Sequence, residues 1–211
     1  MKKMFLLFFT VLLITSCAQM TRFETGKTIG ENNLQWSGQG LAYADFTSQT
    51  FQSTNIFRIE NLVPVFQGSL DYGLAEKVDI GIGISSALNV IVNGKFQIIG
   101  DHNSRFAMSI NPALEVQIVS LNGVYARPHL YLPMSWEINE RQTFILEPRY
   151  SHAGIENAPH TIGFSSGIEF KMKKGWKLAI GGSVFLAPVN SDFRYHLFQL
   201  GIGAKKLIVR E

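Results

Sequence analysis

Residues 64–84 read PVFQGSLDYGLAEKVDIGIGI, and two kinds of side chain alternate along them. Large apolar residues such as Phe66, Leu70 and Ile82 hold even positions, while glutamine, serine, aspartate and glycine hold most odd positions. A period of two residues is the pattern of a β-strand with two different faces. The break at residues 75–77 therefore predicts a turn between two such strands.

The same period continues along the chain from residue 33. Ten segments alternate in this way, at about 34–46, 64–74, 78–84, 90–99, 105–118, 124–137, 142–150, 160–171, 176–186 and 196–206. The pattern predicts an all-β protein, an antiparallel up-and-down transmembrane β-barrel of about ten strands. Eight or twelve strands would result if a turn has been misread.

The connections between these segments alternate in length. Four of them are short, namely 75–77, 100–104, 138–141 and 172–175. Three connections on the opposite side are longer, namely 47–61, 151–159 and 187–195, and two more, 85–89 and 119–123, are short. Short inner turns with longer outer loops are typical of outer-membrane barrels, so we expect the short turns to face the periplasm.

Aromatic residues at even positions gather near the strand ends. Eight lie near the inner ends, namely Trp36, Tyr72, Phe96, Phe106, Trp136, Phe144, Phe170 and Trp176, and four near the outer ends, namely Phe46, Phe66, Tyr150 and Phe198. Two outward-facing belts of aromatic rings are expected where a barrel meets lipid headgroups. The core of a soluble sandwich or lipocalin-like barrel would also alternate, but it would not gather all three tryptophans at one end.

The chain opens with Met-Lys-Lys and an apolar run from Met4 to Ile14, followed by Thr15-Ser16-Cys17. A basic start, a short apolar run and small residues are typical of a secretory signal. The tetrad 14–17 resembles the bacterial lipobox. The resemblance implies cleavage before Cys17 and attachment of lipid, with palmitate among its acyl chains, to Cys17. An ordinary signal peptide that happens to contain a cysteine is the alternative. Cys17 is the only cysteine in the chain, which excludes an internal disulfide.

These features divide the chain into three parts. We expect a lipoprotein signal peptide at 1–16, a lipidated N-terminal tether at 17–32 and a β-barrel domain at 33–208. The residues after Cys17 form either a tether in the periplasm or a partial plug in the barrel, and the sequence leaves both open. The expected location is the bacterial outer membrane, with membrane lipid as the partner.

Charge excludes one class of partner. Removing Lys2 and Lys3 with the leader lowers the formal charge from +3 to +1, which gives no reason to expect nucleic acid. The lysine pairs 173–174 and 205–206 lie at a turn or a strand end, where we expect solvated charges. Charged residues make up only 17% of the chain, below the roughly 25% of a soluble domain.

Several stretches resemble bacterial outer-membrane β-barrels of the small porin-like and opacity-like kind. They are residues 70–74 with 78–81 and residues 95–101, while residues 23–30 resemble the lead-in after the lipidated cysteine of uncharacterised members. Two features depart from that pattern. The chain ends Val209-Arg210-Glu211 rather than in an aromatic residue, so we expect the segment 198–206 to supply the assembly signal. Five prolines lie inside predicted strands, namely Pro64, Pro112, Pro128, Pro133 and Pro148, and each predicts a bulge or a misplaced strand.

If even positions face lipid, odd positions line the lumen. The inward charged residues are predicted to be Arg105, Glu115, Arg127, His129, Glu147, Arg149 and Glu169, opposite a wall rich in glycine. They could line a narrow path for small solutes, with arginine and glutamate setting selectivity. We favour instead a network of internal ion pairs that replaces an apolar core, because the two signs nearly balance.

Membrane barrels can also be enzymes that modify outer-leaflet lipids. The candidate residues are His152 beside Ser151, His160, Glu156, and His196 near Ser191 and Asp192. Residues 150–154 lack the His-x-Ser spacing of lipid A deacylases, and the chain has no Gly-x-Ser-x-Gly. The histidines show no ligand spacing and the glycines form no phosphate loop. We therefore expect no enzyme, metal or cofactor.

Three functions stay open from sequence. The first is an outer-membrane barrel lipoprotein with a structural, interaction or narrow-channel role. The second is a lipid-anchored periplasmic β-barrel or sandwich that binds an apolar ligand, and the third is an outer-leaflet lipid-modifying enzyme.

Overall fold

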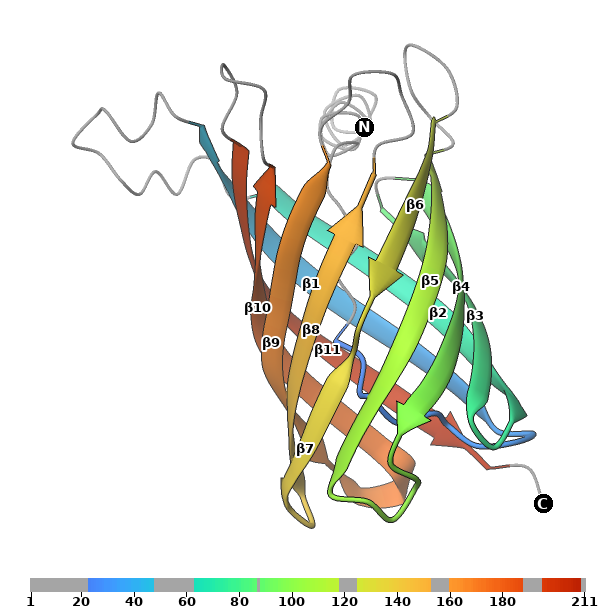
Figure 1. The fold of residues 1–211 in the computed structure, drawn as a ribbon. Helices are drawn as coiled ribbons and strands as arrows, with labels where there is room; N and C mark the ends of the chain where they lie inside the picture. The colour runs from blue at the N-terminus through green and yellow to red at the C-terminus, as the bar shows by residue number, and fades with distance from the viewer. Residues whose placement is uncertain are drawn as a thin grey trace, which may run out of the picture.

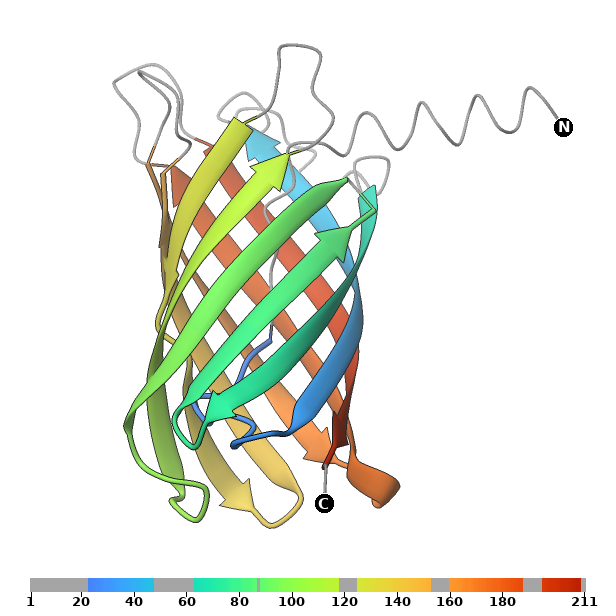
Figure 2. The same ribbon diagram turned by 90° about the vertical axis from the view of Figure 1, so that its right-hand side faces the viewer.

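The computed structural model of the chain describes residues 23–47, 63–86, 88–117, 125–152, 160–187 and 195–209. These residues form a closed, antiparallel, up-and-down β-barrel (Figures 1 and 2). Strands that follow one another in sequence pair, except β6 and β7, and the first strand pairs with the last. The predicted fold class is therefore confirmed. None of the helical segments in this described part is long and apolar enough to cross a bilayer.

Eleven strands occupy ten positions around the ring. They are β1 (Leu34–Thr47), β2 (Val63–Ala75), β3 (Val78–Ser85), β4 (Asn89–Ile99), β5 (Phe106–Gln117), β6 (Tyr125–Tyr131), β7 (Met134–Asn139), β8 (Gln142–Ser151), β9 (Thr161–Lys171), β10 (Trp176–Ala187) and β11 (Tyr195–Ile208). Strands β6 and β7 share one position, because β5 and β8 pair with both of them. The short 3-10 turn η4 (Lys173–Gly175) joins β9 to β10.

The prolines behave in two ways. Pro133 lies in the break between β6 and β7, where its carbonyl accepts a hydrogen bond from the Ser109 amide at 3.0 Å. The other four, Pro64, Pro112, Pro128 and Pro148, lie in strands whose register runs through them without a shift. The bulge predicted at those four positions is therefore wrong. A proline removes only its own donor, and the pairs on either side hold the ladder in register.

The two faces of the wall differ in polarity as predicted. Large apolar side chains at even positions are exposed on the outer face, for example Phe66, Ile82, Val92, Ile180 and Ile202. Most of the buried side chains at odd positions are polar or charged. Ile99 is an exception, since a register shift between Gln97 and Ile99 turns it outward.

One end of the barrel carries the short connections 76–77, 100–105, 140–141 and 172–175, and we call it the turn end. Strand β11 also ends there, at Ile208 (Figure 1). The longer connections fall at the opposite end, the loop end, and most of their residues lie outside the described ones.

The three tryptophans all lie near the turn end, as predicted. The Trp36 and Trp176 rings meet edge to face with centroids 5.2 Å apart. Trp136 packs between Phe106 and Phe144, with centroid distances of 4.9 and 5.8 Å. Phe46 and Phe198 belong to the other predicted belt, but their side chains lie outside the described ones.

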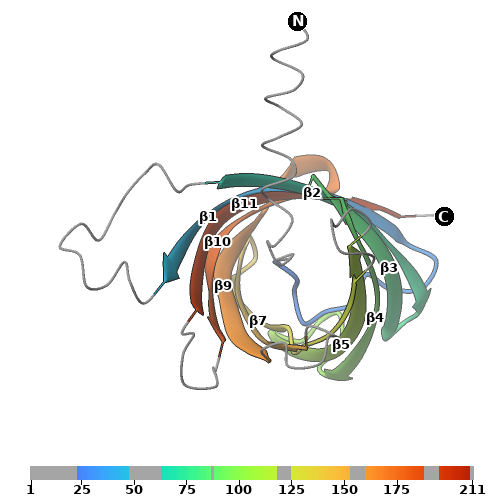
Figure 3. The ribbon, with the colours of Figure 1, turned by 90° about the horizontal axis from the view of Figure 1, so that it is seen from above.

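Residues 23–30 lie inside the ring (Figure 3), and residues 31–33, of which Glu31 and Asn32 are exposed, connect them to β1 at the turn end. We call residues 23–33 the luminal segment. From Phe23, which packs near the middle of the wall, the segment runs toward the turn end and leads into β1. Of the two sequence-based alternatives for this part of the chain, the described residues take the place of a plug. Cys17 lies outside the described residues.

The register of the closing pair can be tested by cross-linking. Gly38 on β1 faces Ala204 on β11, and both lie on the outer face. In a Cys17→Ser background, cysteines at 38 and 204 should form a disulfide, because directly opposed residues of antiparallel strands lie about 4.5–5.5 Å apart. The measurement is gel mobility of the oxidised, heat-denatured protein. Cysteines at 38 and 202 serve as the offset control, and cross-linking of that pair instead would contradict the register.

Candidate functional site in the lumen

The luminal segment is tied to the wall through its backbone. The Gly26 amide donates to the Ser135 hydroxyl at 3.1 Å, and the Ser109 hydroxyl donates to the Gly26 carbonyl. The Thr28 amide donates to Gln97 Oε1 at 2.9 Å. The Ile29 amide lies 3.1 and 3.2 Å from the two carboxylate oxygens of Asp79. An irregular segment enclosed by the wall needs such partners for its peptide groups, and the inward polar side chains supply them.

Close approach of two backbones explains two glycines. A Cβ added to Gly26 would lie 2.2 Å from the Ala107 carbonyl oxygen. A Cβ added to Gly73 would lie 1.7 Å from the Gly30 carbonyl oxygen. Asn32 and Asn33 then exchange backbone hydrogen bonds with Gly73, at 2.8 and 2.9 Å. These main-chain contacts hold the luminal segment against β5 and β2.

Phe23 packs against the part of the wall that the sequence predicted to be rich in glycine. Gly167, Gly181 and Gly201 lie side by side on β9, β10 and β11. A Cβ on Gly181 would lie 2.7 Å from the Phe23 ring, and one on Gly201 would lie 3.0 Å from it. Phe23 is only 2% exposed and clusters with Leu41, Ile145 and Ala179. The absence of side chains on this wall makes room for an aromatic ring.

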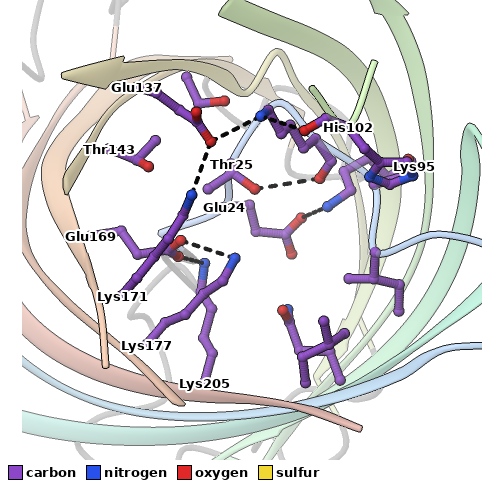
Figure 4. Close-up of a pocket in the computed structure, with 16 residues that line it drawn as sticks. Glu24, Thr25, Lys95, His102, Glu137, Thr143, Glu169, Lys171, Lys177 and Lys205 are labelled. Carbon is purple, nitrogen blue, oxygen red and sulfur yellow. Dashed lines mark hydrogen bonds and ion pairs between the residues drawn. The ribbon is translucent and has the colours of Figure 1, made fainter. Parts of the chain in front are cut away.

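Carboxylates shared between lysines line the mouth of the lumen at the turn end (Figure 4). Glu137 pairs with Lys27 at 2.9 Å and with Lys171 at 3.1 Å. Glu169 pairs with Lys205 at 2.9 Å and with Lys177 at 3.1 Å.

On the other side of the mouth, the pattern is reversed. Lys95 lies between two acids, 3.5 Å from Glu24 and 3.4 Å from Asp79. Together these groups surround a cavity of about 170 Å³, which we call the vestibule.

A second polar layer lies nearer the loop end. Glu115 accepts a hydrogen bond from the side-chain amide Nδ2 of Asn89 at 2.7 Å and lies 2.9 Å from His129 Nε2. His129 in turn stacks on the ring of Tyr131. Glu115 and His129 are both buried, and a buried polar side chain needs a hydrogen-bond partner. Each of the two residues is such a partner for the other.

Arg149, on β8, lies in the same layer, and its partners belong to β8 itself and to the nearby strands β6, β9 and β10. It pairs with Glu147 at 3.1 Å and donates to the Ser165 hydroxyl. Its guanidinium lies 5.2 Å from the ring centroid of Tyr131 and 4.6 Å from that of Phe185. A planar cation held between two rings stays paired although it is buried.

The structure brings five of the seven predicted luminal residues into buried pairs. They are Glu115 with His129, Glu147 with Arg149, and Glu169 with two lysines. Arg127 is half-buried, and no ion pair is found for it among the described residues. Arg105 is exposed, so its prediction as a luminal residue is wrong. It precedes β5, which begins at Phe106, and the strand alternation does not apply outside a strand.

Sequence reasoning missed the lysines of the vestibule. Lys205 was expected to be solvated, yet it is 8% exposed and also donates to the Phe23 carbonyl. Lys95, Lys177 and Lys205 occupy odd positions in their strands, as Glu169 does. Because odd positions face the lumen, the sequence could have indicated that these three lysine side chains point into it. Lys173 and Lys174 are exposed, as expected.

The loop-end histidines that were weighed as catalytic candidates contact one another. The His152 and His160 rings stack with centroids 4.6 Å apart, and His160 Nδ1 hydrogen-bonds the Tyr150 hydroxyl. Glu156, Ser191, Asp192 and the His196 side chain lie outside the described residues. Within the described part, no group of three or more histidine, cysteine or acidic residues could hold a metal.

Comparison with known proteins gives similarity in architecture only. No family model and no curated protein matches the chain. Solved structures with a similar fold include the NanC porin, at 10% identity and a TM-score of 0.44, covering 78% of this chain and 98% of that chain. Neisserial surface protein A has 6% identity and a TM-score of 0.38, covering 83% and 99%. The outer-membrane protease OmpT from Escherichia coli has 9% identity and a TM-score of 0.43, covering 92% and 100%.

The glycine wall should be required to hold the luminal segment. Gly201→Val should expel Phe23 while the barrel still forms, because a Cβ at 201 would meet two side chains first, Leu41 at 2.3 Å and the Phe23 ring at 3.0 Å. Trypsin should then cut after Lys27, which the ion pair with Glu137 holds inside the native barrel. Mass spectrometry of the digest detects the cut. Gly40→Ala, which faces only the Phe66 ring, is the control and should behave as wild type. Protection of Lys27 in the Gly201→Val variant would contradict this packing.

Proposed function

We propose that the protein is a lipoprotein of the bacterial outer membrane whose barrel spans the membrane and is closed by its own N-terminal segment. Its role is structural or one of interaction with other envelope components, rather than that of an open pore. The observation that carries the proposal is the luminal segment, which lies inside the turn-end half of the lumen and is bonded to the wall. The lipid is proposed to be attached to Cys17.

The outer face supports the membrane location. It exposes many large apolar side chains from all around the ring, and Phe66, Val92 and Ile202 are more than half exposed. Such a continuous apolar surface is far larger than soluble monomers tolerate. The tryptophans at the turn end match an interfacial belt, and the short turns there match the periplasmic side of outer-membrane barrels.

The interior argues against the second function, a periplasmic barrel with an apolar ligand. A pocket for such a ligand would be lined by apolar side chains. The vestibule is lined instead by lysine, glutamate, threonine and glutamine side chains, with few apolar ones. The apolar residues that would line a ligand pocket lie on the outer face.

The membrane location can be tested with one charge at two depths. Ile82, in the middle of β3, is 52% exposed, and Ile138, at the turn end of β7, is 58% exposed. In lipid vesicles, Ile82→Lys should lower the free energy of unfolding by about 2–4 kcal/mol and Ile138→Lys by about 0–1 kcal/mol, since the cost depends on depth in the hydrocarbon. Denaturant titration in vesicles measures both. Equal, small effects would mean that the apolar face is not in a bilayer.

Closure can be tested by conductance in planar bilayers. The wild-type mature protein should show no stepwise currents. Deletion of residues 23–29 should also leave the barrel closed, because Arg149 with Tyr131 and Phe185 blocks the next layer. Deletion combined with Tyr131→Ala and Phe185→Ala should give steps, since both layers are then removed.

The two alanine changes without the deletion are the matched control and should stay silent. A heat-dependent shift in gel mobility confirms that each variant folds. Currents through the wild-type protein would overturn the closed barrel in favour of the narrow channel.

A further inference from the structure

We propose that the vestibule binds a small dianionic oxyanion, such as phosphate or a dicarboxylate, on a row of lysines from β9, β10 and β11. The row consists of Lys171, Lys177 and Lys205, which are neighbours in the register of the sheet. All three line the vestibule, together with the side chain of Thr143 from β8. The site adjoins the luminal segment, because Lys205 also donates to the Phe23 carbonyl and Lys27 of that segment shares Glu137 with Lys171.

The charges of the vestibule are unevenly distributed. On one side, Glu137 is shared by Lys27 and Lys171, and Glu169 is shared by Lys177 and Lys205. Each shared carboxylate leaves one ammonium charge uncompensated, so this side has an excess of two positive charges. On the other side, Lys95 faces two acids, Glu24 and Asp79. The excess of positive charge lies on the side where Lys171 of β9 and Lys177 of β10 face each other in the sheet.

Exposure indicates which lysines are free to bind. Within the pairs, the Glu169 side chain is 1% exposed and that of Lys205 is 10% exposed, whereas Lys177 and Lys171 are 27% and 40% exposed. Lys205 is also bonded to the Phe23 carbonyl, which fixes it in place. Lys171 and Lys177 therefore present their ammonium groups to the water of the vestibule.

The shape of the vestibule favours a small ligand. Its volume of about 170 Å³ exceeds the share of about 30 Å³ that one water molecule occupies in the liquid, and it has room for an oxyanion of a few heavy atoms. Walls of low dielectric constant around a positive row concentrate anions. The two excess charges of the lysine side match a dianion held against that side, while the two sides together, five lysines and four acids, keep an excess of one. The Thr143 side chain provides a hydroxyl donor.

The ligand reaches the site from solution. The lysines lie on the inner face of the wall, while the outer face carries the apolar side chains. A phosphate on a lipid headgroup has the same chemistry, but it would have to cross the barrel rim to meet Lys177. We therefore assign the site to a free anion of the compartment at the turn end.

The test is isothermal titration of the mature Cys17→Ser protein, folded in zwitterionic micelles at low salt, with sodium phosphate and with sodium succinate. We expect a dissociation constant on the order of 1 mM for at least one of them. The double variant Lys171→Gln, Lys177→Gln should bind at least about tenfold more weakly, since charged hydrogen bonds of this kind are each worth about a factor of ten. Lys173→Gln, in the exposed turn outside the vestibule, is the matched control and should bind as wild type.

A second variant is expected to change the affinity for the anion in the opposite direction. Glu137→Gln removes the carboxylate that competes for Lys171 and should tighten binding several-fold. Heat-dependent gel mobility shows that each variant is folded, so failure of this proposal is distinguished from failure of the barrel. No saturable heat, equal loss in the Lys173→Gln control, or binding only when phosphatidylglycerol is added to the micelles would overturn it.

Discussion

The lumen of a closed barrel with an apolar outer face has to hold the polar side chains of its strands, and each charge buried there needs a partner. This constraint shapes the interior of the protein. Glu115, Glu147 and Glu169 are each almost fully buried, and each is paired with a base. The luminal segment extends the same rule, because its peptide groups are satisfied by side chains such as Gln97 and Asp79. Wall and segment therefore depend on each other: without the segment, Asp79 would lose the hydrogen bonds from the Ile29 amide, and without those side chains the segment would lose its anchors.

Glycine and aromatic residues solve the remaining problem, which is volume. Ten strand positions enclose more space than the inward side chains of a glycine-rich wall can fill. Phe23 occupies the space over Gly181 and Gly201, and Arg149 with Tyr131 and Phe185 occupies the layer nearer the loop end. The two layers differ in kind. The first belongs to the segment that precedes β1, whereas the second belongs to the strands themselves.

The wall could be predicted from sequence because a strand has a strict period of two. Once Phe66, Leu70 and Ile82 are assigned to one face, the period places Glu115 and Glu169 on the other. The same rule fails where its assumption fails: Arg105 precedes its strand, and Ile99 follows a register shift. Residues 23–33 carry no alternation, so nothing in their own pattern states whether they lie inside or outside. Their position depends on contacts such as that of Gly26 with Ala107, between residues far apart in the chain.

Charged residues are arranged differently at the two ends of the lumen. This difference distinguishes the residues that fill the barrel from those of the proposed anion site. Near the loop end the buried acids and bases are paired one to one, as in Glu115 with His129 and Glu147 with Arg149. Near the turn end each of two carboxylates is shared by two lysines, and the outer member of each pair faces water. A network that served only to fill the barrel would need no such surplus, since extra buried charge costs free energy. On the opposite side of the vestibule Lys95 lies between two acids, so the surplus is confined to the side that carries Lys171, Lys177 and Lys205, and it is this side that favours an anion.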